Sequence, residues 1–325
     1  MKVLHISPHI GGGIGTVIQG WTDRDKSNKH EILLLDIAKT KRKMSVDMCD
    51  NAYALIEDVR KYIGADEFDI VVVHWYDHPM LRDLISKPLR PCRLAFWCHK
   101  RYDVPQEELD CPDVFIDTSP IQGHGKYIWS TGNMERFLAI EPKPHDGFNI
   151  GYVGTVDYKK MHPKFYCMCC DVIGKIPEAR FTIVGENHLS GFPADKFTFT
   201  GKVDDVAPYL AEMDVFGYPL RSDHYGTCEI ALGEAMAAGV VPVVMRNSAE
   251  QEIMEDAKSG YLEPTEEDYI DAIQFLYDNP SARESMSRRT RLHAQELYSI
   301  DTMIQQWDEV FQEMMKKPKT KKGGM

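Results

Sequence analysis

The chain has 325 residues, of which 43% are hydrophobic and 27% are charged, as in a folded globular protein with room for two domains. Its formal net charge of −12 argues against nucleic-acid binding as the main function, because phosphate contacts require a basic surface. The chain has no apolar run near the roughly 20 residues of a membrane span and no signal peptide, so we expect a cytoplasmic protein. Its eight cysteines do not predict a disulfide framework in that setting.

Strands and helical patterns alternate along the chain, which predicts parallel sheets covered by helices. In the first half, apolar runs typical of buried strands occupy residues 3–6, 32–35, 70–73, 94–97 and 114–116, with helical patterns at 52–63 and 80–85. The Pro- and Gly-containing stretch 141–147 (EPKPHDG) is typical of a linker. We therefore predict an N-terminal domain over residues 1–142.

A second set of strands and helices follows this linker. Strands are expected at residues 149–153, 180–184, 197–200, 215–218, 240–244 and 260–262, and helices at 163–173, 206–213, 229–238, 248–256, 266–277, 280–297 and 300–315. We predict an α/β fold of two doubly wound, Rossmann-like domains, residues 1–142 and 143–298, which face each other across a cleft. Ligands of such sheets bind at the carboxyl ends of the strands.

Two short segments are basic despite the overall acidity: residues 39–43 (KTKRK) and the tail that begins at residue 316. The first suggests at most peripheral contact with an anionic membrane, although we favour a solvated loop. Residues 317–325 end in Gly-Gly-Met, and we predict a disordered basic tail.

The run 218–244 (YPLRSDHYGTCEIALGEAMAAGVVPVV) points to a ligand site. A polar loop leads into a helix, whose N-terminus carries unpaired N–H groups that suit a phosphate. Glu234, farther along that helix, is placed to take a ribose diol. Together these features favour a nucleoside-diphosphate site. The competing interpretation is a buried α/β connection with an ordinary solvated glutamate.

The same run resembles the family 4 retaining glycosyltransferases (group 1), which have the GT-B fold. The match is close from Gly233 to Gly239 (GEAMAAG), and there the resemblance implies that Glu234 holds the nucleotide ribose. The family has a first acid eight residues before that glutamate, where this chain has Gly226. Asp223 or Glu229 could replace it, and the two remain open.

The resemblance extends to the loops after other strands. It implies that the donor sugar is held by the loop of Tyr225, Gly226 and Thr227. In the first domain it implies donor contacts from the glycine-rich turn at Gly12 and Gly13, which a purely structural turn explains equally well.

His99 and His74 each follow an apolar strand of the first half. The resemblance implies a histidine near the reacting sugar at His99, whereas for His74 we favour a structural role.

In the second domain the family has an arginine and a lysine that clamp the donor diphosphate. Gly154 matches the family glycine, Lys160 matches the lysine, and Thr155 stands in place of the arginine. Thr155 could bind phosphate through its hydroxyl, and Lys159 or Arg221 could supply the missing charge. An ordinary exposed lysine pair is the alternative. Residues near Lys202 and Val203 would lie by the nucleobase.

The resemblance implies transfer of a sugar, with retention of configuration, from a UDP- or GDP-type donor to a hydroxyl of a glycan, a lipid-linked sugar or a small molecule. It also implies that the last helix, residues 299–316, crosses back to the first domain. No metal or cofactor is expected, because no Asp-x-Asp sequence stands at a strand end. The alternatives are a nucleotide-sugar epimerase, a non-catalytic nucleotide-sugar binding protein and, less favoured, a nicotinamide-dependent dehydrogenase.

Overall fold

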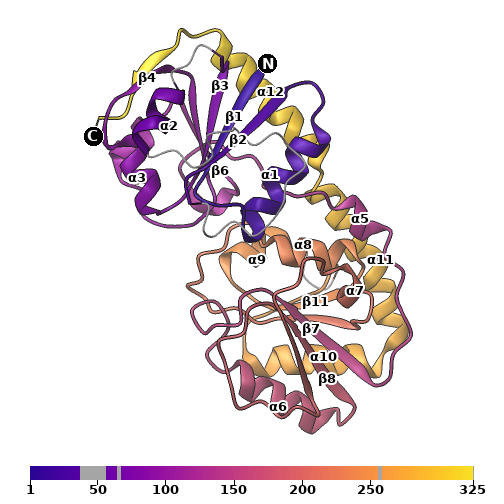
Figure 1. The fold of residues 1–325 in the computed structure, drawn as a ribbon. Helices are drawn as coiled ribbons and strands as arrows, with labels where there is room; N and C mark the ends of the chain where they lie inside the picture. The colour runs from indigo at the N-terminus through magenta and orange to yellow at the C-terminus, as the bar shows by residue number, and fades with distance from the viewer. Residues whose placement is uncertain (37–55, 64–66, 255–257, 325) are drawn as a thin grey trace. The chain divides into compact units, whose positions relative to one another are not determined.

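The computed structural model describes residues 1–36, 56–63, 67–254 and 258–324, so the basic segment 39–43 lies outside the described residues. The chain divides into two compact units (Figure 1). Unit 1 comprises Met1–Asn133, Gly226–Cys228 and Ser299–Met325, and unit 2 comprises Met134–Tyr225 and Glu229–Tyr298. No helix in the described parts of the chain is long and apolar enough to cross a membrane.

Unit 1 is built on a parallel sheet of five strands in the order β2-β1-β3-β5-β6. The strands are β1 (Lys2–Ser7), β2 (Lys29–Leu34), β3 (Ile70–Trp75), β5 (Leu94–Cys98) and β6 (Val114–Asp117). β3 and β5 are buried along their whole length because helices cover both faces, which explains their near-continuous apolar sequences. The strand order reverses between β1 and β3, the position where doubly wound sheets bind ligands.

The last helix of the chain belongs to unit 1, where the resemblance placed it. The helices of this unit are α1 (Gly12–Arg24), α2 (Ile56–Ile63), α3 (Pro79–Ser86), α4 (Gln106–Asp110), the 3-10 turn η2 (Pro120–Gln122) and α12 (Ile300–Met315). α12 packs on α1 (Figure 1), and Trp307 lies 5.0 Å from Trp21 and 5.3 Å from Trp97 between ring centroids. Arg24 and Asp301 add an exposed ion pair.

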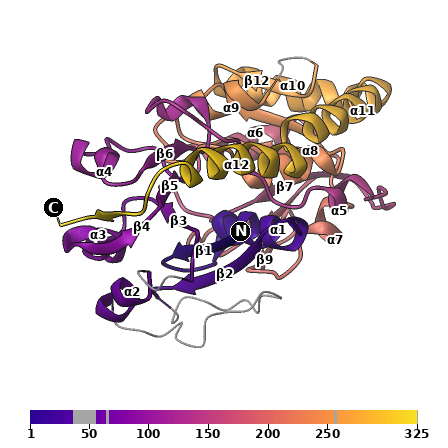
Figure 2. The same ribbon diagram turned by 90° about the horizontal axis from the view of Figure 1, so that it is seen from above.

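The basic tail differs from the expectation of disorder. Residues Thr320–Lys322 form β13, which pairs antiparallel with β4 (Leu89–Cys92), and Figure 2 shows this strand following α12. Lys322 Nζ donates to Asp113 Oδ1 at 2.6 Å, and the Gly324 amide donates to Ile85 O at 2.9 Å. The tail is therefore held by one largely buried carboxylate and by main-chain bonds that composition does not reveal.

Unit 2 is built on a parallel sheet of six strands in the order β12-β11-β10-β7-β8-β9. The strands are β7 (Phe148–Val153), β8 (Ala179–Val184), β9 (Phe197–Gly201), β10 (Val215–Tyr218), β11 (Val241–Met245) and β12 (Tyr261–Glu263). Counted from β7, this is the 3-2-1-4-5-6 order of dinucleotide-binding folds. The order reverses between β7 and β10, so the carboxyl ends of these two strands mark the expected ligand position.

Unit 2 begins earlier than the linker that the sequence suggested. Its helices are α5 (Glu135–Leu138), α6 (Phe165–Lys175), α7 (Ala207–Leu210), α8 (Ile230–Ala237), α9 (Ser248–Ile253), α10 (Glu266–Asp278) and α11 (Pro280–Leu297). Arg291 on α11 donates to Leu138 O at 2.9 Å and to Ile140 O at 3.0 Å, which ties α5 to this unit. The stretch 141–147 consequently lies inside unit 2, and the units divide at residues 133/134.

Candidate functional site

The loops after β7, β8 and β10 approach each other closely at the carboxyl edge of the unit 2 sheet. Gly154 follows β7 and Gly185 follows β8, with positive φ angles of 152° and 144°. A Cβ atom on Gly185 would stand 1.8 Å from the carbonyl oxygen of Gly154, so only glycine fits there. The main chain of the β7 loop then runs alongside the segment after β10, because the Arg221 amide donates to Lys160 O at 3.0 Å.

This alignment places Lys160 against a buried glutamate. Lys160 Nζ lies 2.9 Å from Glu229 Oε2 and 2.9 Å from the hydroxyl of Tyr218. That hydroxyl itself donates to Glu229 Oε2 at 2.7 Å. An ammonium group has three N–H donors, of which these bonds use two. The third is available for a ligand at the carboxyl end of β10.

The three side chains hold Lys160 and Glu229 in their charged forms. Burial by itself favours the neutral amine, but the charge of Glu229 and its hydrogen bond raise the pKa of Lys160 above its ordinary value. Burial likewise disfavours the carboxylate, yet the charges of Lys160 and His224 lower the pKa of Glu229. Burial and the neighbouring Glu229 raise the pKa of Tyr218, so the phenol stays protonated as a donor.

The backbone at Glu229 is strained. With φ 33° and ψ 67°, it is the only non-glycine residue with a positive φ among the residues that the structure describes. It caps the N-terminus of α8, where main-chain N–H groups and the helix dipole favour negative charge. Such strain persists where surrounding contacts fix it and is common at functional sites.

Two further buried polar side chains, His224 and Glu250, continue the contacts of Glu229. His224 Nδ1 lies 3.5 Å from Glu229 Oε1, and its Nε2 lies 3.2 Å from Glu250 Oε2. Glu250 is fully buried at the start of α9. Tyr218 and His224 were not singled out from the sequence. The only sequence feature that could have indicated Tyr218 and His224 is their position in the run 218–244, which contains the loop predicted to bind a phosphate.

The structure separates the two acids that the sequence left open. Asp223 is exposed and pairs with Arg221, two residues away. The guanidinium of Arg221 therefore makes its ion pair with Asp223 and not with the Lys160–Glu229 group. Only Glu229 is brought together with Lys160. Tyr225, in the same loop, is exposed.

The remaining predicted residues of unit 2 lie at varied depths. Glu234 is 8% exposed within α8, one turn beyond its start. Thr155 and Lys202 are exposed, and Val203 is half-buried. The main-chain carbonyl oxygen of Thr155 accepts a hydrogen bond from the Tyr152 hydroxyl at 3.0 Å. The Thr155 hydroxyl takes no part in this bond. In the described residues, no group of three His, Cys, Asp or Glu side chains could hold a metal ion.

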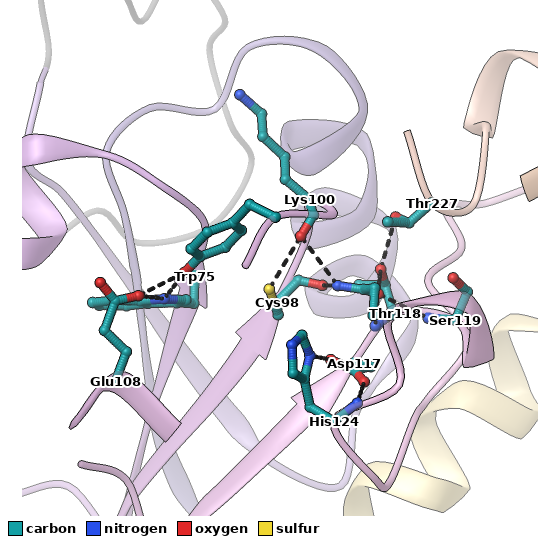
Figure 3. Close-up of polar contacts among 11 residues, drawn as sticks. Trp75, Cys98, Lys100, Glu108, Asp117, Thr118, Ser119, His124 and Thr227 are labelled. Atoms are coloured by element: carbon teal, nitrogen blue, oxygen red, sulfur yellow. Dashed lines mark hydrogen bonds and ion pairs between the residues drawn. The ribbon is translucent and has the colours of Figure 1, made fainter. Parts of the chain in front are cut away.

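In unit 1, Thr227 is occupied by a structural contact. Its hydroxyl lies 2.8 Å from that of Thr118 (Figure 3). Cys228 Sγ donates to Thr118 O at 2.8 Å. Gln122 links this region to the end of β5 through Cys98 O at 2.9 Å. Gly226–Cys228 is thereby anchored to the carboxyl ends of β5 and β6.

The other predicted residues of unit 1 lie at the same edge of their sheet. Gly12 and Gly13 are exposed at the N-terminus of α1, directly after β1. His99 follows β5, and its Nε2 lies 2.9 Å from His74 Nδ1. His74 is fully buried within β3.

Comparison with known proteins connects this geometry to a family. Residues 147–279 match the family model described as glycosyl transferases group 1. This segment is of the group 1 glycosyl transferase type. It contains the reversal point of the unit 2 sheet, the Lys160–Glu229 pair and α8 with Glu234, so the resemblance inferred from the GEAMAAG motif is confirmed there. Among curated proteins, none matches the sequence.

Solved structures show the fold of the chain. HepE of Anabaena, in complex with UDP and glucose, is 14% identical with a TM-score of 0.73, over 96% of this chain and 100% of that one. Sucrose-phosphate synthase of Thermosynechococcus elongatus is 15% identical with a TM-score of 0.71, over 97% and 99%. A glycosyltransferase of Rickettsia africae is 12% identical with a TM-score of 0.71, over 97% and 98%. The α/β fold with two Rossmann-like sheets is therefore confirmed as that of the GT-B glycosyltransferases.

Proposed function

We propose that this protein is a retaining, metal-independent glycosyltransferase that moves a sugar from a nucleoside-diphosphate sugar to an acceptor hydroxyl. The observation that carries the proposal is the Lys160–Glu229 pair at the sheet reversal of a segment that matches group 1 glycosyl transferases. No cofactor is required, and the donor acts as co-substrate. The acceptor is a glycan, a lipid-linked sugar or a small molecule, and the protein acts in the cytoplasm.

The leaving diphosphate is stabilised by a fixed positive charge. Glu229 and Tyr218 hold the Lys160 ammonium in one place, and its third N–H is directed to a phosphate oxygen. The N-terminus of α8 adds main-chain donors, which compensate for Thr155 in the position of an arginine. Because these groups are positioned before the reaction, little reorganisation is needed when negative charge develops on the diphosphate.

The remaining groups orient the donor. Glu229, held in a left-handed conformation at the start of α8, takes the place of the first acid beside the donor sugar, in preference to Asp223. Glu234, one turn farther along α8, binds the ribose diol. Retention follows if the leaving diphosphate itself accepts the proton of the acceptor hydroxyl on the same face of the sugar, with no protein nucleophile.

Uridine is the nucleoside that we favour. HepE was solved with UDP and with UDP-glucose, and a pneumococcal O-GlcNAc transferase of similar fold (TM-score 0.60, 15% identity) was solved with UDP and GlcNAc. These ligands were bound by those proteins, and they make UDP the first nucleotide to test with this one.

The first test is a thermal-shift panel of UDP, GDP, ADP and dTDP. A ligand at about 100 times its dissociation constant adds about 2.7 kcal/mol to the free energy of unfolding. We expect UDP to stabilise the wild-type protein, and Lys160→Met and Glu234→Ala to lose most of that stabilisation. Lys159→Met separates the two neighbouring lysines: we expect this exposed residue to leave the shift unchanged, and a loss equal to that of Lys160→Met would assign the diphosphate contact to Lys159 instead.

Sugar transfer is then measured with nucleotide sugars of the base that gives the thermal shift. The anomeric configuration of the product is determined by NMR. Binding without transfer or hydrolysis would favour the second candidate, a non-catalytic nucleotide-sugar binding protein. This candidate is considered because Thr155 stands in place of the family arginine and Gly226 in place of the first family acid. Free epimerised donor would indicate an epimerase. No shift with any nucleotide would refute the donor site.

A further inference from the structure

Four histidines and one aspartate form a continuous hydrogen-bonded chain across the sheet of unit 1. Asp25 Oδ2 lies 2.9 Å from His30 Nε2, and His30 Nδ1 lies 2.9 Å from His5 Nε2. The chain continues from His5 Nδ1 to His74 Nε2 at 3.1 Å and from His74 Nδ1 to His99 Nε2 at 2.9 Å. Every ring nitrogen is used except Nδ1 of His99, which has no hydrogen-bond partner among the residues that the structure describes.

The register of the sheet explains how the rings meet. His30 on β2 pairs with Val3 on β1, two residues before His5. The same offset of two residues separates the partner of His5 from His74, and the partner of His74 from His99. Side chains two residues apart on a strand share a face, so all four rings lie on one face and advance toward the carboxyl edge of the sheet. The chain therefore runs from Asp25, after α1, to the ligand-binding edge.

The surroundings keep His5, His74 and His99 neutral and Asp25 charged. Burial lowers the pKa of His5 and His74 well below the ordinary value and lowers that of His99 to about 3. Burial opposes the charge of Asp25, but hydrogen bonds, the strongest from His30, hold the pKa of this carboxyl below its ordinary value. Trp21 contributes to the apolar surroundings, 4.8 Å from His5 between ring centroids.

When His30 is neutral, the carboxylate of Asp25 fixes the direction of every hydrogen bond in the series. A carboxylate only accepts, so His30 must donate from Nε2, and its bare Nδ1 must accept from Nε2 of the next ring. A neutral imidazole carries one N–H, so the same choice passes from ring to ring until His99 donates from Nε2. We propose that Asp25, His30, His5 and His74 are positioning residues that hold His99 in the Nε2–H tautomer and present its Nδ1 as a hydrogen-bond acceptor for a ligand hydroxyl. The role of that hydroxyl in sugar transfer rests on the proposed function.

Replacement of Asp25 by asparagine should reverse the whole chain. Asp25 Oδ1 accepts from the main-chain amides of Ser27 at 2.8 Å and Asn28 at 3.2 Å, which cannot become acceptors. In Asp25→Asn we therefore expect the amide oxygen to stay at the position of Oδ1 and the NH2 group to face His30 in place of Oδ2. Asn28 Nδ2, which donates to Oδ2 at 2.9 Å, keeps its bond to Asp308 Oδ1 at 2.9 Å and gives up the one to residue 25. His30 then accepts at Nε2 and donates from Nδ1, and each following ring does the same. His99 would end with Nδ1–H, a donor where the wild type has an acceptor.

The test is two-bond ¹H–¹⁵N NMR of histidine-labelled protein, which distinguishes the two tautomers directly. It is made in mildly alkaline buffer, where an imidazole of ordinary pKa is neutral. We expect His5, His30, His74 and His99 as Nε2–H in the wild type and as Nδ1–H in Asp25→Asn. Asp117→Asn is the matched control, because Asp117 binds His124, outside the chain. A neutral Nδ1–H form of His74 or His99 in the wild type would overturn the proposal even if Asp25→Asn does not fold.

Turnover provides the second measurement. In folded Asp25→Asn we expect the kcat of sugar transfer to fall about 10- to 100-fold, by analogy with the partners that orient metal-binding histidines. Stabilisation by UDP should remain, since Asp25 lies in unit 1 and the proposed diphosphate contacts lie in unit 2. Reversed tautomers with unchanged turnover would overturn the role in transfer. A wild type that transfers no sugar would refute the proposed function, while the NMR result would still decide the role of the chain.

Discussion

Lys160 and Glu229 depend on each other for their charge. The Glu229 side chain is 2% exposed and that of Lys160 is 16% exposed, so removal of either partner leaves a largely buried ion without compensation. We expect Lys160→Met to lower the free energy of unfolding by about 3–5 kcal/mol. The double variant Lys160→Met/Glu229→Gln should lose less than the sum of the two single variants, because it buries no unpaired charge. Urea denaturation of the four proteins measures this coupling.

Lys159→Met is the control for this cycle. Lys159 is exposed, so its substitution should change the free energy of unfolding by no more than about 0.5 kcal/mol. Additive losses in the double variant would show that the two side chains act independently and would contradict the buried pair.

The sequence indicated these residues only in part. Motif spacing pointed to Lys160 and Glu234, but Asp223 and Glu229 were indistinguishable, because a linear motif does not say which acid is buried. The choice depends on the main chain at residues 160 and 221, which brings Lys160 beside β10 and leaves Asp223 with its neighbour Arg221. Such contacts between distant segments have no signature within the motif.

At the scale of elements, helices with strong local signals were predicted well. α11 and α12 begin and end at the predicted residues, because Pro280 starts the first and Ser299 caps the second by accepting from the Thr302 amide. β13 was missed because three residues rich in lysine show no strand periodicity, and the strand exists only through pairing with β4. The histidine chain was also missed, although His5, His30, His74 and His99 stand on or directly after neighbouring strands at the offsets that the register requires.

α12 is held in unit 1 mainly by Trp307. This residue is fully buried against Trp21, Trp97 and Phe311, and no hydrogen bond of its Nε1 is found in the described residues. Trp307→Ala therefore removes packing alone, and we expect a loss of about 3–5 kcal/mol in the free energy of unfolding. Met315→Ala, at the exposed end of the same helix, should cost far less. Equal effects of the two substitutions in urea denaturation would contradict this account of how α12 is anchored.

At the scale of the whole molecule, the two units differ in their tryptophan content and in the ionisable side chains that they bury. All five tryptophans of the sequence lie in unit 1, at positions 21, 75, 97, 129 and 307, so tryptophan fluorescence reports the unfolding of that unit. His5, His30, His74 and His99 lie in the same unit, whereas the core of unit 2 contains the Lys160–Glu229 ion pair. The stability of unit 1 should consequently have its own pH dependence.

We expect acid to destabilise unit 1 progressively below about pH 6.5, the ordinary pKa of histidine. The folded-state pKa values of His5 and His74 lie well below that of the unfolded chain, so between the two values only the unfolded state binds the protons. Stability is therefore fully present above about pH 6.5 and falls as the pH decreases, by up to about 1.4 kcal/mol per pH unit for each group. Urea denaturation followed by tryptophan fluorescence at several pH values measures the slope. His74→Gln should reduce the slope by one proton, and an unchanged slope would mean that His74 does not stay neutral in the folded protein.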